Sequence, residues 1–136
     1  MFQLIRVPID IQKIADGLQK PEDGALVVFE GVVRNNSQDK AVRFLEYDAY
    51  ESMALKKIEE IGSRARNQFA IRDIAIVHRL GRMDIGECSV AIIVASAHRG
   101  SAFEACRFAI DTIKKIVPIW KKEFYEDGEV WIEGAH

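Results

Sequence analysis

The sequence predicts an α+β fold in which strands pair mostly as hairpins and at least two helices are substantial. Apolar residues recur at helical spacing in segments 51–69 and 101–116. Four other stretches are rich in valine, isoleucine or aromatic residues and have the character of strands. Near the C-terminus, Asp127-Gly128 lies between two short β-like runs and is typical of a hairpin turn.

The composition is that of an ordinary globular protein. With 136 residues, of which 49% are hydrophobic and 29% charged, we expect residues 1–136 to form one domain with a sizeable core. The net charge of −2 gives no general affinity for nucleic acid or an anionic membrane, so an anion site must be local. The longest apolar run, VAIIVASA, is too short to span a bilayer, and the N-terminus does not resemble a signal peptide.

The N-terminal half predicts a short helix, two strands and a long helix. DIQKIADGL forms an amphipathic helix that closes near Gly17. Residues 24–34 and 41–50 have β character and flank the polar loop NNSQDK, so we expect a hairpin with a long loop. In segment 51–69 the apolar residues at helical spacing are Met53, Ile58, Ile61, Ala65 and Phe69.

The C-terminal half begins with two strands, at 71–80 and 88–97, separated by a turn region. A helix follows from about Ser101 to Ile116. Ser101 and Glu104 have the spacing of a capping box, which places the helix start after Gly100. Pro118 ends the helix because proline disfavours helical backbone before it.

His98 and Arg99 stand at the expected start of this helix. A helix start carries unpaired N–H groups and a partial positive charge, which suit an anion. The two side chains add donors of the same sign, so an anion site is one interpretation. The alternative is a solvated turn with idle charges.

Further along the same helix, we expect Phe103, Cys106, Ile110 and Ile113 to share a stripe that faces the core. The polar residues Arg107, Asp111 and Lys114 lie together beside that stripe.

After Pro118 the period changes to two, so Ile119, Lys121, Glu123 and Tyr125 point one way. One interpretation is a solvated row of ion pairs. The other is that the proline corner turns Lys114 and Lys121 into one cleft, where a lysine serves as general acid or base.

The two cysteines, Cys88 and Cys106, form neither a disulfide framework nor a metal motif. We expect both to be small buried hydrophobic residues rather than reactive thiols, in a reducing, cytoplasmic setting. Three scattered histidines provide no zinc motif.

Several motifs occur in a fixed order along the chain. S-A-H-R at 96–99 is followed by S-A-F-E at 101–104, and K-x-x-x-P-x-W-K-x-E spans 114–123. Upstream, GALVVFEGVVRNN contains a Gly-x-Val-Arg strand end. From about Gly24 to Glu133 the chain therefore resembles the large, catalytic subunit of molybdopterin synthase.

The resemblance implies an α/β-hammerhead type of fold, mostly antiparallel sheet with two main helices. It also implies a sulfurtransferase that converts cyclic pyranopterin monophosphate into molybdopterin in molybdenum cofactor biosynthesis. The sulfur arrives as a thiocarboxylate at the C-terminal Gly-Gly of a small ubiquitin-like partner subunit. The implied assembly is a heterotetramer, a homodimer of large subunits with one small subunit at each end, and no metal or bound cofactor is implied.

Roles follow from the resemblance residue by residue. Lys114 and Lys121 match the family's catalytic lysines, and we expect them to share proton transfer and oxyanion stabilisation. An arginine suits a phosphate because its planar fork donates two parallel hydrogen bonds. The residues that match substrate-binding positions are Val32, Val33, Arg34, His98, Arg99, Lys114, Lys121, Lys122 and Glu123.

The helix is too long for one chain to supply the whole site. From Ser101 to Lys114 it rises by about 20 Å, which exceeds the size of a pterin monophosphate. In a two-fold dimer with antiparallel helices, the start of one helix lies beside the end of the other. We therefore predict that Lys114 and Lys121 of one subunit share a pocket with the second subunit's His98 and Arg99.

Some residues depart from the family pattern. Ile110 stands where methionine is common, which conserves volume. Asn35 and Asn36 replace a common glycine, so a differently shaped loop is expected there. Two other function classes stay open from the sequence alone: a binding module with a basic cleft, and a structural protein with an incidental anion site.

Overall fold

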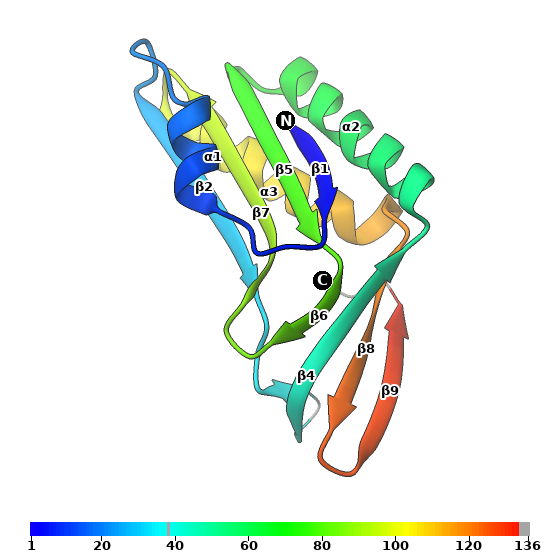
Figure 1. Ribbon diagram of the computed structural model, residues 1–136. Helices are drawn as coiled ribbons and strands as arrows, with labels where there is room; N and C mark the ends of the chain where they lie inside the picture. Colours follow the sequence, from blue (N-terminus) through cyan, green and yellow to red (C-terminus); the bar gives the residue numbers. More distant parts are fainter. Residues whose placement is uncertain (38, 134–136) are drawn as a thin grey trace.

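The structure, a computed structural model, describes residues 1–37 and 39–133, the last five of these by their backbone alone. Three helices and nine strands follow one another along this part of the chain (Figure 1). In chain order they are β1 (Phe2–Ile5), α1 (Ile11–Leu18), β2 (Ala25–Val32), β3 (Asn36–Ser37), β4 (Lys40–Ala49), α2 (Glu51–Gln68), β5 (Asp73–Arg79), β6 (Gly81–Asp84), β7 (Cys88–Ser96), α3 (Arg99–Ile116), β8 (Ile119–Tyr125) and β9 (Gly128–Glu133).

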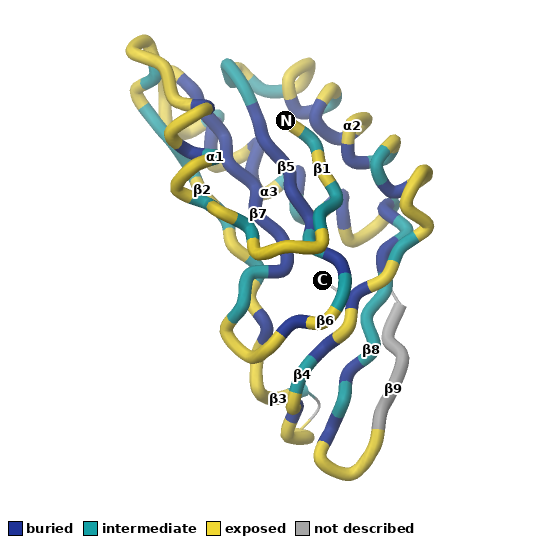
Figure 2. The backbone as a smooth tube through the Cα atoms, in the orientation of Figure 1, coloured by how far each residue is buried: buried dark blue, intermediate teal, exposed yellow. Residues whose placement is uncertain are grey.

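The first sheet has the strand order β1-β5-β7-β2, with α1 on one face and α2 and α3 on the other (Figure 1). β5 and β7 are buried along almost their whole length (Figure 2), which explains why they are nearly continuous apolar runs. On one face, Ala75, Ile93 and Ala95 pack against α1. On the other face, alternate residues of the same strands face α2 and α3 and form the main core.

The second sheet has the order β3-β4-β8-β9, with β6 also paired to β4. β8 and β9 form the hairpin that Asp127-Gly128 predicts, with Tyr125 opposite Gly128. Gly128 has a φ of +156°, a backbone conformation that glycine adopts without strain. The α+β class, the mostly antiparallel pairing and the two main helices, α2 and α3, are confirmed.

The expected hairpin between segments 24–34 and 41–50 is wrong. β2 pairs with β7, from Ala25 opposite Ser96 to Val32 opposite Cys88, while β4 belongs to the second sheet. The physical reason is that β7 is apolar on both faces, as is typical of a central strand. A central strand needs a hydrogen-bonded neighbour at each of its two edges. β5 covers one edge of β7, and β2 covers the other.

The expected inward faces of the two long helices are largely confirmed, with Ile58, Ile61, Ala65, Cys106 and Ile113 buried, but one residue of each face is exposed. Met53 is 47% exposed and Phe103 is 60% exposed. The buried stripe of α3 is instead made largely of small residues, which let the helix lie close to the sheet: Ala102, Ala105, Cys106, Ala109, Thr112 and Ile113. On α3, small residues that face the sheet are buried, whereas the large Phe103 on the neighbouring face of the helix is exposed.

The predicted capping box is wrong as well. α3 begins at Arg99, two residues earlier than expected, and its N-cap is His98 in extended conformation. Ser101 therefore lies inside the first turn rather than before it. His98 makes no side-chain cap hydrogen bond, and α3 is instead held by its packing on β7 and β2.

No helix in the described part of the chain is both long and apolar enough to cross a membrane.

Candidate active site

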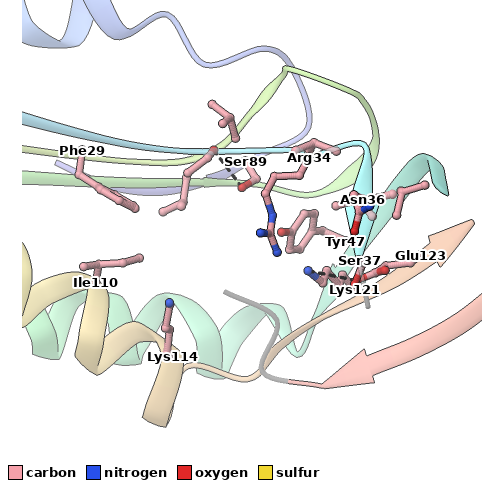
Figure 3. Close-up of a pocket in the computed structure, with 16 residues that line it drawn as sticks. Phe29, Arg34, Asn36, Ser37, Tyr47, Ser89, Ile110, Lys114, Lys121 and Glu123 are labelled. Carbon is pink, nitrogen blue, oxygen red and sulfur yellow. Dashed lines mark hydrogen bonds and ion pairs between the residues drawn. The ribbon is translucent and has the colours of Figure 1, made fainter. Parts of the chain in front are cut away.

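A cavity of about 300 Å³ lies where the two sheets meet, between the end of β2, the last turns of α3 and the start of β8 (Figure 3). Both polar and apolar side chains line it. The residues that line it are Phe29, Gly31, Val32, Val33, Arg34, Asn36, Ser37, Val42, Leu45, Tyr47, Ser89, Val90, Ile110, Lys114, Lys121 and Glu123.

The end of β2 is bent into the cavity by a local irregularity. The register of β2 on β7 shifts between Gly31 and Val32. Gly31 fits there because a Cβ would lie 2.7 Å from Val90 Cγ1, closer than a side chain tolerates. After this bulge the chain leaves the sheet, so Val33 is buried in the wall and Arg34 reaches across the cavity (Figure 3).

Three cationic side chains from separate elements line the cavity. Arg34 follows β2, Lys114 comes from the last turn of α3, and Lys121 comes from β8 (Figure 3). Pro118 ends α3 and starts β8 within a few residues, so both lysines face one space. Of the two interpretations left open by the sequence, the structure shows the cleft that both lysines line. It provides a concentration of positive charge in a protein whose net charge is −2.

Glu123 is the acidic residue in this lining, and it is 1% exposed. Lys121 Nζ lies 3.3 Å from Glu123 Oε1, and Ser37 Oγ donates to the same oxygen at 3.2 Å. The Tyr125 hydroxyl donates to Glu123 Oε2 at 2.7 Å. The lysine–glutamate alternation of β8 is therefore a buried ion pair at a cavity, rather than a solvated row.

These contacts decide the charge of the carboxylate. Burial raises the pKa of Glu123, but the hydrogen bonds from Tyr125 and Ser37 and the nearby Lys121 lower it by more, so its pKa lies below 4.5. The bond to the carboxylate raises the pKa of Tyr125 above 10.0, and burial adds to this. Near neutral pH Glu123 is therefore ionised and the Tyr125 phenol keeps its proton.

Tyr47 and Ser89 also line the cavity. Tyr47 is 5% exposed, and burial raises the pKa of its phenol above 10.0. Ser89 Oγ donates to the Gly31 carbonyl oxygen at 3.2 Å, which fixes the strand just before the bulge. Neither residue was singled out by the sequence.

The structure brings together most of the residues expected at the site. Six of them line the cavity: Val32, Val33, Arg34, Lys114, Lys121 and Glu123. Lys122 does not, because strand alternation turns it to the other face, where Nζ lies 5.1 Å from the centre of the Phe124 ring. His98 and Arg99 are also absent from the lining; they are exposed at the far end of α3.

Several lining residues were missed by sequence reasoning: Phe29, Asn36, Ser37, Tyr47 and Ser89. Strand alternation was the available signal for Phe29, which lies two residues before Gly31. Ser37 gave no signal, because a serine in a polar loop is ordinary. Its role depends on a contact with Glu123, which is 86 residues away.

Neither cysteine has the surroundings of a nucleophile. Cys106 is 5% exposed, as expected, and burial raises its pKa to about 11. Cys88 is only partly buried, and burial together with Glu30 raises its pKa to about 11. In the part of the chain that the structure describes, no group of three or more His, Cys, Asp or Glu side chains is placed to hold a metal.

Comparison with known proteins places this site in a family. The family model for the MoaE protein matches residues 4–116. The molybdopterin synthase catalytic subunit of Bacillus subtilis is 45% identical over 131 residues, which cover 96% of this chain and 83% of that protein. The corresponding protein of Halalkalibacterium halodurans is 44% identical over 131 residues, covering 96% and 84%.

Solved structures agree. The structure of molybdopterin synthase from Staphylococcus aureus matches with a TM-score of 0.92 at 40% identity and covers 96% of each chain. At 24% identity and a TM-score of 0.77, the same fold occurs in a Helicobacter pylori protein–protein complex of subunits 1 and 2 of molybdopterin-converting factor. The chain therefore belongs to the MoaE family, the catalytic subunits of molybdopterin synthase, and is an enzyme of molybdenum cofactor biosynthesis.

Proposed function

We propose that this enzyme is a sulfurtransferase that converts cyclic pyranopterin monophosphate into molybdopterin. The sulfur donor is the C-terminal thiocarboxylate of a small ubiquitin-like partner subunit. The observation that carries the proposal is the meeting of Arg34, Lys114 and Lys121 at one cavity of about 300 Å³. A phosphate and a thiocarboxylate are both anions, and such a cavity attracts both.

Each sulfur transfer has a simple balance. The thiocarboxylate sulfur forms a bond to a carbon of the pterin side chain while the carbon–oxygen bond at that carbon breaks; the displaced oxygen stays on the opened phosphate ester in one transfer and leaves as water in the other. Water then adds to the acyl carbon of the partner's terminal glycine, the old carbon–sulfur bond breaks, and the partner leaves with a carboxylate. Two rounds supply the two sulfurs of the dithiolene, and the chain needs no sulfur nucleophile of its own.

Lys114 and Lys121 both act at the acyl carbon, one by stabilising an oxyanion and the other by transferring a proton. The addition of water creates an oxyanion, which an ammonium group stabilises when it is held in place before the reaction. The other lysine moves the proton between water, sulfur and the leaving group. Arg34 binds the substrate phosphate through its planar fork, and the backbone of Val32 and Val33 lies beside it.

The site is completed by a second copy of the chain. α3 has 18 residues, so its two ends lie about 26 Å apart. His98 and Arg99 are exposed at one end, while Lys114 faces the cavity at the other. In a two-fold dimer the partner's His98 and the partner's Arg99 reach this cavity and add two donors for the anionic substrate. The full assembly proposed is a heterotetramer with one small subunit on each large subunit.

The proposal extends to domain and location. Residues 1–136 act as one domain, because a single core cluster contains side chains from both sheets, among them Ile76 and Ile119. The two free thiols support a cytoplasmic location, where cysteines stay reduced.

The test is reconstitution. The purified chain is mixed with a thiocarboxylated small subunit and cyclic pyranopterin monophosphate, and the dithiolene product is measured. Product that depends on all three components is expected. The proposal is wrong if this chain gives no product with a small subunit that does give product with another large subunit.

A further inference from the structure

A buried carboxylate in the wall of a cavity built for anions is an unexpected feature. Glu123 repels any anion in the cavity, yet it lies beside Lys121 with 1% of its surface exposed. Burying a charge is costly unless the charge is fully paired. The partners of Glu123 therefore indicate what the carboxylate does.

Both oxygens of Glu123 are occupied. Oε1 receives Lys121 Nζ at 3.3 Å and Ser37 Oγ at 3.2 Å, and Oε2 receives the Tyr125 hydroxyl at 2.7 Å. A carboxylate that is buried and already satisfied is poorly placed to bind substrate or to accept a proton from it. Its contacts instead allow it to hold the neighbouring side chains in fixed positions.

One of those groups is the Lys121 ammonium. A lysine side chain has four rotatable bonds and loses considerable rotamer freedom when it is fixed. The Lys121 side chain is 20% exposed and ends at Glu123 Oε1, so the carboxylate determines where the ammonium lies at the cavity. Tyr125, two residues further along β8 and 5% exposed, holds the other oxygen and so fixes the plane of the carboxylate.

The other group is the loop that follows Arg34. β3 contains only Asn36 and Ser37 and pairs with the first residues of β4. Ser37 connects this short ribbon to β8, because its hydroxyl reaches Glu123 from 86 residues away (Figure 3). Arg34 lies three residues before Ser37, so the same carboxylate restrains the loop that carries the arginine.

We propose that Glu123, Tyr125 and Ser37 form a positioning cluster in which Tyr125 orients Glu123, Glu123 fixes the ammonium of Lys121, and Ser37 holds the Arg34 loop against β8. The kinetic consequences rest on the proposed function, in which Lys121 acts on the reacting acyl group and Arg34 binds the substrate phosphate. None of the three residues is then a catalytic residue, and each acts through a cation.

The two hydroxyls are expected to affect different kinetic constants. Tyr125→Phe keeps the ring, including its contact with Lys40 Nζ 5.2 Å from the ring centre, and removes only the bond to Glu123. It should lower kcat by about tenfold with little change in KM, because a slightly misplaced catalytic group slows the chemical step. Ser37→Ala should raise KM for the pterin severalfold and leave kcat nearly unchanged.

Matched control variants make the comparison specific. Tyr50→Phe removes a hydroxyl from a tyrosine that is 58% exposed, and Ser63→Ala does so at an exposed position of α2. Both should retain wild-type kinetics. The proposed role of Tyr125 would be overturned if Tyr125→Phe kept the wild-type kcat, or if Tyr50→Phe lowered kcat by as much as Tyr125→Phe does. A Ser37→Ala variant with unchanged KM would overturn the connection to the Arg34 loop.

A second measurement needs neither partner nor substrate. The chain is labelled with a trace of acetic anhydride, and acetylation of Lys121 is compared with that of the exposed Lys56 by mass spectrometry. Lys121 should become severalfold more reactive in Tyr125→Phe and Glu123→Gln, since its ammonium is released from the carboxylate. Unchanged reactivity in both variants would overturn the cluster, even if reconstitution succeeds. Increased reactivity without product formation would instead contradict the proposed function alone.

Discussion

Two inactive variants of this enzyme should restore activity to each other. In α3, Arg99 and Lys114 are 15 residues apart, which corresponds to about 22 Å along the helix axis. That distance is larger than the substrate, so the proposed site takes these two residues from different chains of the dimer. In the proposed site, Arg99→Ala removes a substrate-binding residue and Lys114→Ala removes a catalytic residue.

The magnitude follows from counting sites. When the two variants exchange subunits freely at equal amounts, half of the dimers are mixed, and each mixed dimer has one intact site. The mixture should therefore show about a quarter of the wild-type activity, while each variant alone is inactive. The assay is dithiolene formation with a thiocarboxylated small subunit, and differently tagged chains measure the fraction of mixed dimers by mass spectrometry.

A matched control distinguishes shared sites from sites within one chain. An Arg99→Ala, Lys114→Ala double variant mixed equally with wild type should also give about a quarter of the activity, because its mixed dimers have no intact site. Sites contained within one chain would give about half in this control and none in the complementation. About half of the activity in the control and none in the complementation, with mixed dimers present, would refute the shared site.

Three further predictions concern single residues. Lys121→Arg keeps the charge but cannot give up a proton, so kcat should fall by about 10²-fold with the unfolding temperature unchanged; a wild-type kcat would contradict proton transfer by this lysine. Gly62→Ala places a Cβ against the Phe2 ring and should destabilise the protein by about 1–3 kcal/mol in urea unfolding, whereas unchanged stability would show that β1 moves freely. The hydrogen bond from Arg72 lowers the pKa of Asp23 below its ordinary value of 3.8. The ionised carboxylate therefore stabilises the fold above pH 3.8, and this stabilisation is lost as the pH falls below that value. The difference in unfolding temperature between Asp23→Asn and wild type should therefore shrink below that pH, and a difference independent of pH would contradict the ion pair.

Local patterns predicted the part of the site that lies near Pro118. The change from helical to strand periodicity placed Lys121, Glu123 and Tyr125 on one face, and the contacts of Glu123 with the other two side chains confirm it. The proline corner correctly brought Lys114 to the same space. These predictions succeeded because the period of a helix or strand is set by the backbone of a few neighbouring residues.

Contacts between distant segments could not be read from the same patterns. The sequence contains no signal that β2 pairs with β7, because a valine-rich strand fits several partners equally well. The exposed position of Phe103 had a similar cause: helical spacing suggested that it faces the core, but the buried stripe of α3 is the adjacent one, made largely of small residues. Ser37 and Tyr47 became visible as cavity residues only after the two sheets were placed together.

The most direct test of the account is where the substrate phosphate binds. A crystal structure of the chain soaked with cyclic pyranopterin monophosphate should show the phosphate at the cavity between β2, α3 and β8, in contact with Arg34 and with the partner's Arg99 across a two-fold axis. Phosphate bound elsewhere on the chain, with the cavity between Lys114 and Lys121 still empty, would contradict it.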